Sequence, residues 1–449
     1  MVRVITYGSY DMLHYGHIRL LERAKALGDY LIVGVTSDDY DKTRGKINLQ
    51  QTLMERIEAI KATGIPDEVI IEEYEGQKID DIKRYGVDIF TVGSDWTGYF
   101  DYLEEYCKVV YLERTEGISS SDIRAEKSSL KLGLVGDASF LEKVLKESTV
   151  VNGVNVVGIC SNCLIHLSQK LCEISTITED IEELFPFVDA VYIHSYPQVH
   201  YSQIKRAILS GKHILCESPM TINKAQCQEL IELATENHVI LMEAIRTAYA
   251  TAYQRMLLLL KAGKIGEIIS VDATCTSLKS VAKGGNGKID KKWNSLAAWG
   301  PIGLLPVFQI LGTNYIKKEI ISHMSSTDLE DKFDLFSKVN FVYPNATASV
   351  KVGRGVKSEG ELVVSGTKGY LYVPAPWWKT DYFEVRYENP AENKRYFYQL
   401  DGEGIRYELV SFSKSIRALK SAEIIDKSVT LAIASVMEDF MNSKDLILI

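Results

Sequence analysis

Several features that would assign the chain to a special class of protein are missing from its 449 residues. No apolar run approaches the roughly 20 residues that a membrane-spanning helix needs. Positive charge is not in excess, because 51 lysines and arginines stand against 60 aspartates and glutamates, for a net charge of −9. This balance argues against a general binder of nucleic acids or membrane surfaces. The first residues enter an apolar strand pattern at once, so we expect no signal peptide and a cytoplasmic location.

The cysteines give no sign of a disulfide framework or a zinc site. There are seven of them, an odd number, scattered along the chain. Cys160 and Cys163 form a CxxC pair, but no second pair has zinc-finger spacing. We therefore expect cytosolic thiols and no metal held by the protein's own ligands. Internal repeats and low-complexity tracts are also missing.

The remaining composition is that of an ordinary globular protein with more than one domain. Hydrophobic residues make up 46% of the chain and charged residues 25%. A chain of 449 residues exceeds one ordinary core. Alternating strand and helix patterns start at residue 2 and restart near residue 131. We expect domains over residues 1–128, 129–245 and 246–449.

The most informative stretch is TYGSYDMLHYGH, residues 6–17. It joins an apolar run typical of a buried strand to a segment with helical spacing. Gly8 lets the backbone approach a ligand closely. The helix start offers N–H groups and the positive end of the dipole, and His14 and His17 share one face there. This arrangement is suited to a triphosphate on which charge develops. The alternative is that the two histidines only cap the helix.

The letters HYGH are the HxGH signature of the nucleotidyltransferase superfamily, and those around them resemble the glycerol-3-phosphate cytidylyltransferase family. A second signature, RTEGISSS at residues 114–121, is similar to that family's RTEGIST motif. The resemblance covers about residues 1–128. It implies transfer of CMP from CTP to glycerol 3-phosphate or a related polyol phosphate, with release of pyrophosphate. The product would be of the CDP-glycerol type, for teichoic acid or capsule-type polymers.

The resemblance also implies roles for individual residues. His14 and His17 would hold the α and β phosphates, while Arg114 and Lys46 would act on the leaving side. The alternatives are a surface ion pair for Arg114 and a solvated loop for Lys46, with Arg44 as second choice. Mg²⁺ would bridge the phosphate oxygens. The substrate-binding residues would be Tyr7, Gly8, Ser9, Asp11, Arg56, Lys78, Asp95, Trp96, Thr115, Ser119 and Ser120.

The implied chemistry is a direct displacement at the α-phosphorus by an oxygen of the acceptor phosphate. A phosphate needs little deprotonation near neutral pH, so catalysis rests on positioning and charge neutralisation. The identity of the acceptor stays open, because Tyr74 and Glu75 stand where the family has a tryptophan.

From about residue 131 the strand and helix patterns alternate again, which predicts a second doubly wound sheet. This part resembles the Gfo/Idh/MocA oxidoreductase family, most clearly in VDAVYIHSYPQVHYSQIKRAILSGKHILCESPM. The resemblance implies a Rossmann domain for NAD(P), then a C-terminal α/β domain with a largely antiparallel open sheet. Such sheets often make the oligomer in that family. We therefore expect an α/β fold throughout and a homo-oligomer.

The cofactor-binding positions of that family are only partly kept. Gly133 and Gly136 stand at the glycine-rich turn, but the later small residues of the pattern are missing. A fragment of this pattern is weak support for a dinucleotide site. Ser161 stands where an acidic residue would bind the ribose hydroxyls.

Three catalytic positions of that family are also changed. Ser218 replaces the lysine of the EKP motif, and a neutral serine cannot replace it in proton transfer. Pro301 and Leu305 replace an Asp and a His or Tyr. We expect this half to bind a dinucleotide or sugar-like ligand without redox turnover, or to serve assembly. The alternative is a bifunctional enzyme whose rear half reduces a polyol or sugar phosphate with NAD(P). An atypical site of that kind would draw on His194, His200, Glu243 or Arg246.

Overall fold

The computed structural model describes residues 1–37, 49, 51–74, 76–113, 129–136, 138–161, 168–278, 294–325, 333–419 and 424–449. The chain divides into two compact units. The first comprises Met1–Ser129 with Val151–Gly153, and the second comprises the rest. Within the described ranges, no helix has the length and apolar character to cross a bilayer.

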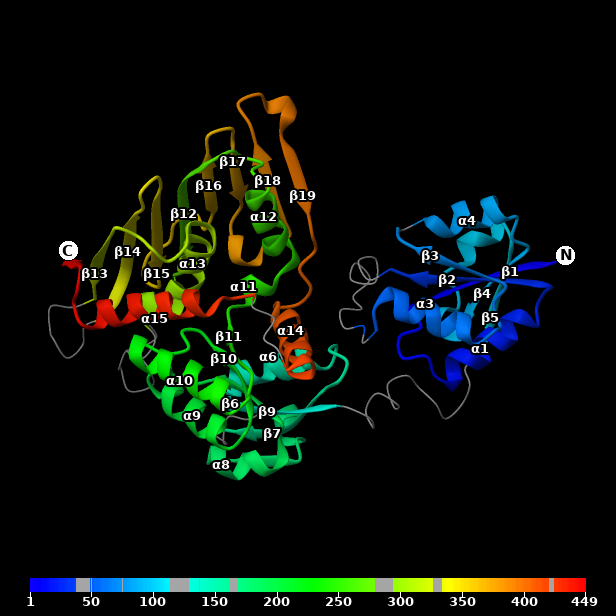
Figure 1. Cartoon of the computed structure of the whole chain (residues 1–449), viewed down its shortest axis with the longest axis horizontal. Coiled ribbons are helices and arrows are strands. Elements are labelled where there is room, and N and C mark those ends of the chain that lie inside the picture. Colours follow the sequence, from blue (N-terminus) through cyan, green and yellow to red (C-terminus); the bar gives the residue numbers. More distant parts are fainter. Residues whose placement is uncertain are drawn as a thin grey trace. The chain divides into compact units, whose positions relative to one another are not determined.

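The first unit is built on a five-stranded parallel sheet in the order β3-β2-β1-β4-β5 (Figure 1). Its strands are β1 (Arg3–Gly8), β2 (Tyr30–Thr36), β3 (Glu68–Glu72), β4 (Ile89–Gly93) and β5 (Lys108–Leu112). Its described helices are α1 (Tyr15–Lys25), α3 (Leu53–Ala62) and α4 (Gln77–Tyr85), with short 3₁₀ turns η1 (Ser94–Trp96) and η2 (Asp101–Glu105).

Alternating side chains of the central strands give the first unit two apolar layers. Val4 of β1 packs with Leu21 of α1 and Ile57 of α3 on one face. Ile5 of β1 packs with Ile82 of α4 on the other. Helices α1 and α3 therefore cover one face and α4 the other. Buried parallel strands of this kind read as continuous apolar runs, which made them visible in the sequence.

The second unit begins with a six-stranded parallel sheet in the order β11-β10-β9-β6-β7-β8. Its strands are β6 (Leu130–Gly136), β7 (Val154–Cys160), β8 (Thr176–Thr178), β9 (Ala190–His194), β10 (His213–Glu217) and β11 (Leu241–Ala244). Its helices are α6 (Ala138–Ser148), α7 (Gln169–Cys172), α8 (Ile181–Leu184), α9 (Pro197–Leu209) and α10 (Lys224–Glu236), with the 3₁₀ turn η4 (Phe185–Phe187).

A nine-stranded sheet in the order β19-β18-β17-β16-β12-β15-β14-β13-β20 completes the second unit. Its pairs are antiparallel except β12–β15 and β13–β20. Its strands are β12 (Ile268–Thr276), β13 (Lys317–Met324), β14 (Asp334–Val342), β15 (Thr347–Gly353), β16 (Leu362–Gly366), β17 (Tyr370–Val373), β18 (Tyr382–Arg386), β19 (Lys394–Phe397) and β20 (Leu446–Leu448).

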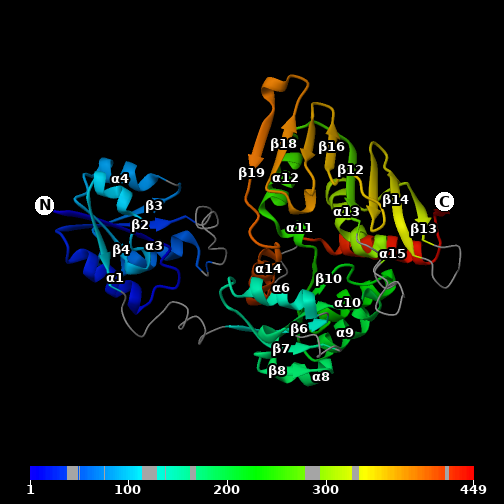
Figure 2. The ribbon, with the colours of Figure 1, turned by 180° about the vertical axis from the view of Figure 1, so that it is seen from behind.

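The second unit has five further described helices: α11 (Arg246–Tyr249), α12 (Thr251–Lys261), α13 (Ser295–Leu311), α14 (Ile405–Ala418) and α15 (Lys427–Met441). Two 3₁₀ turns, η6 (Trp377–Lys379) and η7 (Pro390–Glu392), lie in the same part of the chain. Helix α13 packs on β12, β14 and β15, while α14 returns to α6 of the parallel sheet. Helix α15 packs against both α10 and α13, as the two opposite views show (Figures 1 and 2).

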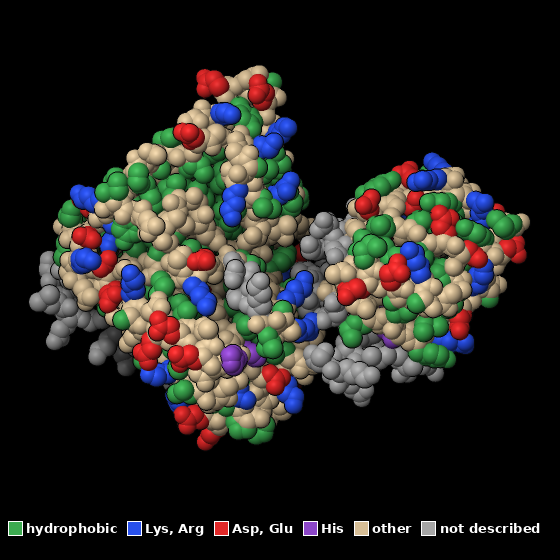
Figure 3. Space-filling view, viewed as in Figure 1, with side chains coloured by type: hydrophobic (Ala, Val, Ile, Leu, Met, Phe, Trp, Pro, Cys, Tyr) green, Lys and Arg blue, Asp and Glu red, His purple; other side chains and the backbone are tan. Residues whose placement is uncertain are grey.

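The expected fold class is confirmed: two parallel Rossmann-like sheets precede a mixed, largely antiparallel sheet. Acidic and basic side chains are interspersed over the face of each unit seen in Figure 3. That distribution agrees with the modest net charge of −9.

Candidate functional site

The topology of the first sheet predicts a ligand crevice beside β1. From β1 the chain adds β2 and β3 on one side, and then crosses to add β4 and β5 on the other. Ligands of open parallel sheets bind at such a switch point, outside the carboxyl ends of the strands. Gly8 is the last residue of β1 and Gly93 is the last residue of β4, so the loops after both strands begin at this edge.

His14 and His17 lie together at the start of α1. Their ring centroids are 3.8 Å apart with an interplanar angle of 24°. His14 is the N-cap, and its Nδ1 accepts from the Gly16 N–H at 3.1 Å. The proton of a neutral His14 ring therefore sits on Nε2, which can donate to an anion. Both histidines are half-buried, and the positive end of the helix dipole lies beside them. His14 thus does cap the helix, as the alternative held, and anion binding by the pair stays a prediction.

The loop between β1 and α1 adopts a conformation that few side chains favour. Tyr10 and Met12 both have φ of 50°, in the left-handed region. A Cβ on Gly8 would come within 3.0 Å of the Tyr10 ring, so glycine allows Tyr10 to fold back over the strand end. Tyr10 is buried and meets His17 edge-on at 5.5 Å. Strained backbone of this kind concentrates at functional sites.

Asp11 and Arg56 hold this loop in place. Asp11 is buried, and its Oδ1 accepts from the Gln51 N–H at 3.0 Å. Arg56 of α3 is fully buried, and its Nη1 donates to Ser9 O at 2.7 Å and Thr36 O at 2.9 Å. Arg56 and Asp11 were expected to bind substrate, and that stays a prediction. The structure shows in addition that they position the loop, which the sequence did not reveal.

Tyr7 and Lys78 belong to a buried polar network beneath the crevice. Tyr7 donates its hydroxyl to Asp81 Oδ2 at 2.9 Å, and burial raises the pKa of that phenol. Lys78 of α4 forms an ion pair with the fully buried Glu72, and its Nζ lies 4.6 Å from the Tyr7 ring centroid. The neighbouring Gln77 donates to Asp81 Oδ2 at 3.1 Å. The pair Gln77–Lys78 is therefore already engaged inside the protein.

Asp95 and Trp96 stand at the end of β4, at the same edge as the histidines. They lie in η1, with Asp95 exposed and Trp96 half-buried. Trp96 meets Tyr99 at 5.4 Å and Phe100 at 5.8 Å between ring centroids. A firmly packed indole beside an exposed carboxylate is suited to a base and a ribose.

Lys46, Arg114, Thr115, Ser119 and Ser120 lie outside the described residues, so their roles stay predictions. The flanking residues are described. Ser37 follows β2, and Glu113 follows β5, whose Leu112 pairs with Gly93. Arg23 of α1 donates to Glu113 O at 2.8 Å. Both segments therefore leave the sheet at the edge where α1 begins.

Among the described ranges, no group of three or more His, Cys, Asp or Glu side chains could hold a metal ion. Asp11 has one oxygen on Gln51, and Asp95 is exposed on its own turn. The donor set fits a Mg²⁺ ion that arrives on nucleotide phosphates better than one resident in a protein cage.

The glycine turn of the second parallel sheet has a different character. Gly133 lies inside β6, where a Cβ would come within 2.8 Å of Leu184. Gly136 has φ of 128°, and a Cβ there would come within 1.8 Å of His194 O. Ser161 is buried and gives its N–H to Thr178 O at 3.1 Å. Strand packing accounts for these three residues, and their role in cofactor binding stays a prediction.

Side chains fill the space beside this turn. The Phe140 ring of α6 stacks on His194 with centroids 3.8 Å apart and 6° between planes. Arg246 lies on the same ring, with Cζ 5.4 Å from its centroid. His200 is fully buried, and each ring nitrogen lies 3.0 Å from a carbonyl oxygen, one of Pro219 and one of Ser195. Burial lowers the pKa of His200 to about 4, so the ring is neutral at pH 7 and donates to only one of them.

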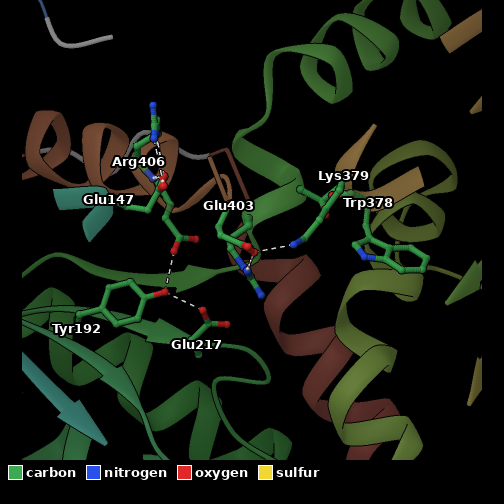
Figure 4. Close-up of polar contacts among 10 residues, drawn as sticks. Glu147, Tyr192, Glu217, Trp378, Lys379, Glu403 and Arg406 are labelled. Atoms are coloured by element: carbon green, nitrogen blue, oxygen red, sulfur yellow. Dashed lines mark hydrogen bonds and ion pairs between the residues drawn. The ribbon is translucent and has the colours of Figure 1, made fainter. Parts of the chain in front are cut away.

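A proton-sharing cluster joins the parallel sheet to α14 (Figure 4). The Tyr192 hydroxyl lies 2.7 Å from Glu217 Oε1 and 2.7 Å from Glu408 Oε1. A phenol carries one proton, so one carboxyl must donate to the phenol oxygen while the other accepts from it. Burial and the charge of Glu217 raise the pKa of Glu408 well above its usual value. Glu408 is therefore the protonated partner.

Three further ion pairs lie beside this cluster (Figure 4). Glu147 of α6 accepts from Arg406 of α14 at 2.8 Å and 3.1 Å, a bidentate pair. Glu403 accepts from Lys379 at 2.6 Å and lies 3.8 Å from Arg246. Sequence analysis named Arg246 and the EKP-type segment that contains Glu217, but it missed the cluster because the members come from distant segments.

The changed catalytic positions are apolar or neutral in the structure as well. Pro301 and Leu305 are buried within α13. Ser218 follows β10 and is half-buried. The described side chains thus include neither an ammonium at position 218 nor a titratable group at 301 and 305. They do not fit the hydride chemistry of the oxidoreductase family, although the fold fits a dinucleotide.

Comparison with known proteins supports the division into two parts. A family model described as cytidylyltransferase-like matches residues 5–126. Glycerol-3-phosphate cytidylyltransferase of Bacillus spizizenii is 46% identical over 130 residues, which cover 29% of this chain and 100% of that enzyme. The enzyme of the same name from Staphylococcus aureus is 48% identical over 130 residues, covering 28% of this chain and 95% of that enzyme.

The second unit resembles a different family. A model described as oxidoreductase family, NAD-binding Rossmann fold, matches residues 130–245. A 3-ketoreductase from Actinomadura kijaniata, solved with TDP-benzene and NADP, has a TM-score of 0.61 at 17% identity and covers 72% of this chain and 100% of its own. UDP-N-acetylglucosamine 3-dehydrogenase from Acidithiobacillus ferrooxidans has a TM-score of 0.59 at 14% identity, covering 71% of this chain and 98% of its own. At these identities the likeness shows the fold alone.

Proposed function

We propose that this chain, which belongs to the glycerol-3-phosphate cytidylyltransferase family through its first unit, transfers CMP from CTP to glycerol 3-phosphate or a related polyol phosphate. Relatives at 46% and 48% identity carry that name. The observation that supports it most directly is the stacked pair His14 and His17 at the start of α1. The pair stands at the switch point of the sheet, on the edge that also carries Asp95 and Trp96.

In this proposal an acceptor phosphate oxygen forms a bond to the α-phosphorus of CTP, and the bond to the bridging oxygen of pyrophosphate breaks. His14 donates from Nε2 to a phosphate oxygen, because its Nδ1 is held by Gly16 N–H. His17 stands beside it, and the N–H groups of α1 add positive potential. Donors fixed before the reaction stabilise the charge of the transition state without reorganisation.

Lys46 and Arg114 would neutralise the leaving pyrophosphate, since their segments leave the sheet at this edge. Mg²⁺ would come with the nucleotide and supply charge neutralisation between phosphate oxygens. Trp96 and Asp95 would contact the base and ribose, and Ser9 and Gly8 the phosphate chain.

The acceptor site lies with the network under Tyr7 in this proposal. The Lys78 ammonium would attract the acceptor phosphate, but it is paired with Glu72, both of them buried. Lys78 would have to interact with the acceptor phosphate while it remains paired with Glu72. This requirement favours a small acceptor that can approach the buried network. Glycerol 3-phosphate meets this requirement.

Pyrophosphate release by the full chain tests the proposal. Glycerol 3-phosphate with CTP should give product, and the same acceptor with ATP should give little. A clear preference for ATP would refute the cytidylyl assignment and indicate an adenylyltransferase. Substituting ribitol 5-phosphate or other polyol phosphates for glycerol 3-phosphate identifies the acceptor.

A second candidate activity is an NAD(P)-dependent reductase in the second unit. The family model favours it. Against it stand Ser218, Pro301 and Leu305 at the positions that would carry proton transfer. We infer that this unit holds a dinucleotide or sugar-like ligand without hydride transfer, or serves assembly as a homo-oligomer. Calorimetry with NAD⁺ and NADP⁺ tests binding, and NADPH oxidation with sugar phosphates tests turnover. Measurable turnover would establish the bifunctional enzyme instead.

A further inference from the structure

A cavity of about 490 Å³ lies at the β11 edge of the six-stranded sheet. Consecutive residues from His238 to Glu243 line one side of it. Ile231 and Ala234 of α10 line a second side, and Thr430 of α15 a third. Sites for small molecules occupy about 300–1,000 Å³, so the volume is that of a ligand pocket.

This cavity is separate from the glycine turn of the same sheet. Strands β10 and β9 stand between β11 and β6 in the sheet order. The turn at Gly136, which ends β6, therefore lies in another part of the unit. Glu217 of the Tyr192 cluster is nearer, because it stands on β10, next to β11, with Ala244 as its register partner. The function proposed above does not use the β11 edge.

The wall of the cavity is mostly apolar, and its polar members include Thr430 and one buried acid. Met220, Val239, Ile240, Met242 and Tyr249 are all buried in it. The charged or titratable residues His238 and Lys427 lie at the exposed rim. Glu243 is 3% exposed and lines the interior.

The two carboxyl oxygens of Glu243 differ in their hydrogen bonding. Oε1 accepts from the Met220 N–H at 3.0 Å. Oε2 is buried and makes no hydrogen bond of good geometry among the described residues, although the Thr430 hydroxyl is close enough to act on the carboxyl. Burial raises the pKa of Glu243 to about 7, against the lowering effects of Thr430 and the Met220 N–H. A buried polar atom left unsatisfied destabilises the fold, so a donor that reached Oε2 would bind with a gain.

We propose that this cavity binds an apolar molecule that carries one primary amine, with the ammonium paired to Glu243 and the hydrocarbon against the apolar wall. An ammonium favours the ionised carboxyl and gives a charge-assisted hydrogen bond, about twice as strong as a neutral one. An alcohol of the same shape offers only the neutral bond. A carboxylate would place a second negative charge in the same apolar space.

Calorimetric titration of the full chain with three matched probes tests the proposal: 2-phenylethylamine, 2-phenylethanol and phenylacetate. The wild type should bind the amine at least tenfold more tightly than the alcohol, and phenylacetate more weakly than either. Glu243→Gln should bind amine and alcohol alike. Glu236→Gln, on the exposed face of α10 and outside the cavity, should keep the wild-type preference.

Equal binding of amine and alcohol by the wild type, no binding of any probe, or an amine preference that survives in Glu243→Gln would each overturn the proposal. A crystal structure of the wild type with 2-phenylethylamine decides the matter if Glu243→Gln does not fold. The nitrogen should lie within hydrogen-bond distance of Glu243 Oε2. Amine bound elsewhere, with this cavity empty, would also refute the site.

Discussion

The two parallel sheets of this chain start alike and end differently. In each, the first strand closes on a glycine, Gly8 in β1 and Gly136 in β6, and a helix follows. At the first edge the loop after the glycine leads to two half-buried histidines at the start of α1. At the second edge Phe140 stacks on His194, and Tyr192 shares a proton with two buried carboxyls.

The difference shows that the architecture sets where a site lies, while a few side chains decide whether it has chemistry. Fold alone does not establish activity. The first edge carries side chains suited to an anion, whereas the second unit has Ser218, Pro301 and Leu305 at its changed catalytic positions. Four changes would break or sharpen this comparison.

The largest effect is expected at the first edge. His17→Ala should lower kcat for CMP transfer by about two orders of magnitude or more, as removal of a preorganised donor does. Pyrophosphate release under saturating CTP measures it. The matched control is His323→Ala, an exposed histidine of β13, which should keep the wild-type rate. A His17→Ala rate near that of the wild type would remove the central assignment.

The next effect concerns the pH dependence of the stability of the second unit. Folding raises the pKa of Glu243 from 4.5 to about 7, so between these values the native state holds a proton that the unfolded state has lost. The free energy of unfolding should therefore fall as pH rises from 4.5 to 7, by about 3 kcal/mol at most from this group. Asp334, raised from 3.8 to about 6, acts in the same direction.

Urea unfolding of wild type and Glu243→Gln at several pH values isolates the contribution of Glu243. The free energy of unfolding of Glu243→Gln should increase relative to that of the wild type as pH rises from 4.5 to 7. A constant difference across that range would show that Glu243 is ionised throughout, and Glu236→Gln should give no pH-dependent difference.

A smaller effect is expected in the proton-sharing cluster. Tyr192→Phe removes the hydroxyl between Glu217 and Glu408 and should cost about 1–3 kcal/mol, because buried carboxyl oxygens lose their partner. Glu408→Gln keeps a donor toward the Tyr192 oxygen and should cost under about 1 kcal/mol. Chemical unfolding of both variants at pH 7 gives the comparison. Equal losses would mean that Glu408 is not the protonated member.

The smallest effect should come from restoring one lost group. Ser218→Lys returns the ammonium of the oxidoreductase motif but leaves Pro301 and Leu305 in place. No NADPH oxidation should appear with sugar or polyol phosphates, because proton transfer still lacks its other groups. Turnover in this variant would show that the second unit is one substitution from activity and would contradict the view that Pro301 and Leu305 disable it.

The strands and the histidine pair of the first unit were predictable from the sequence, but the contacts of Arg56 were not. Residues 30–36 formed a continuous apolar run and are β2, because buried parallel strands have no polar alternation. The histidine pair was predictable, since it falls between a strand and a helix with a local motif. Arg56 was expected at substrate but holds Ser9 O and Thr36 O, contacts that join β1, β2 and α3.

The second site could not be predicted from local patterns. Tyr192 and Glu408 are 216 residues apart and meet only because α14 returns to the parallel sheet. Glu243 was noted among candidates for an atypical reductase, yet its cavity depends on how α10 and α15 flank β11. Long-range packing of this kind leaves no periodicity in the sequence.

The cap that His14 provides has one consequence for acid conditions. Its Nδ1 lone pair receives the Gly16 N–H, so a second ring proton would turn that acceptor into a donor and break the bond. Protonation of Nδ1 would thus loosen the first turn of α1. The same protonation would give the imidazole the positive charge that attracts an anion. The same ring cannot serve as both anchor and cation, so the neutral imidazole is the form that keeps the cap and leaves its proton on Nε2.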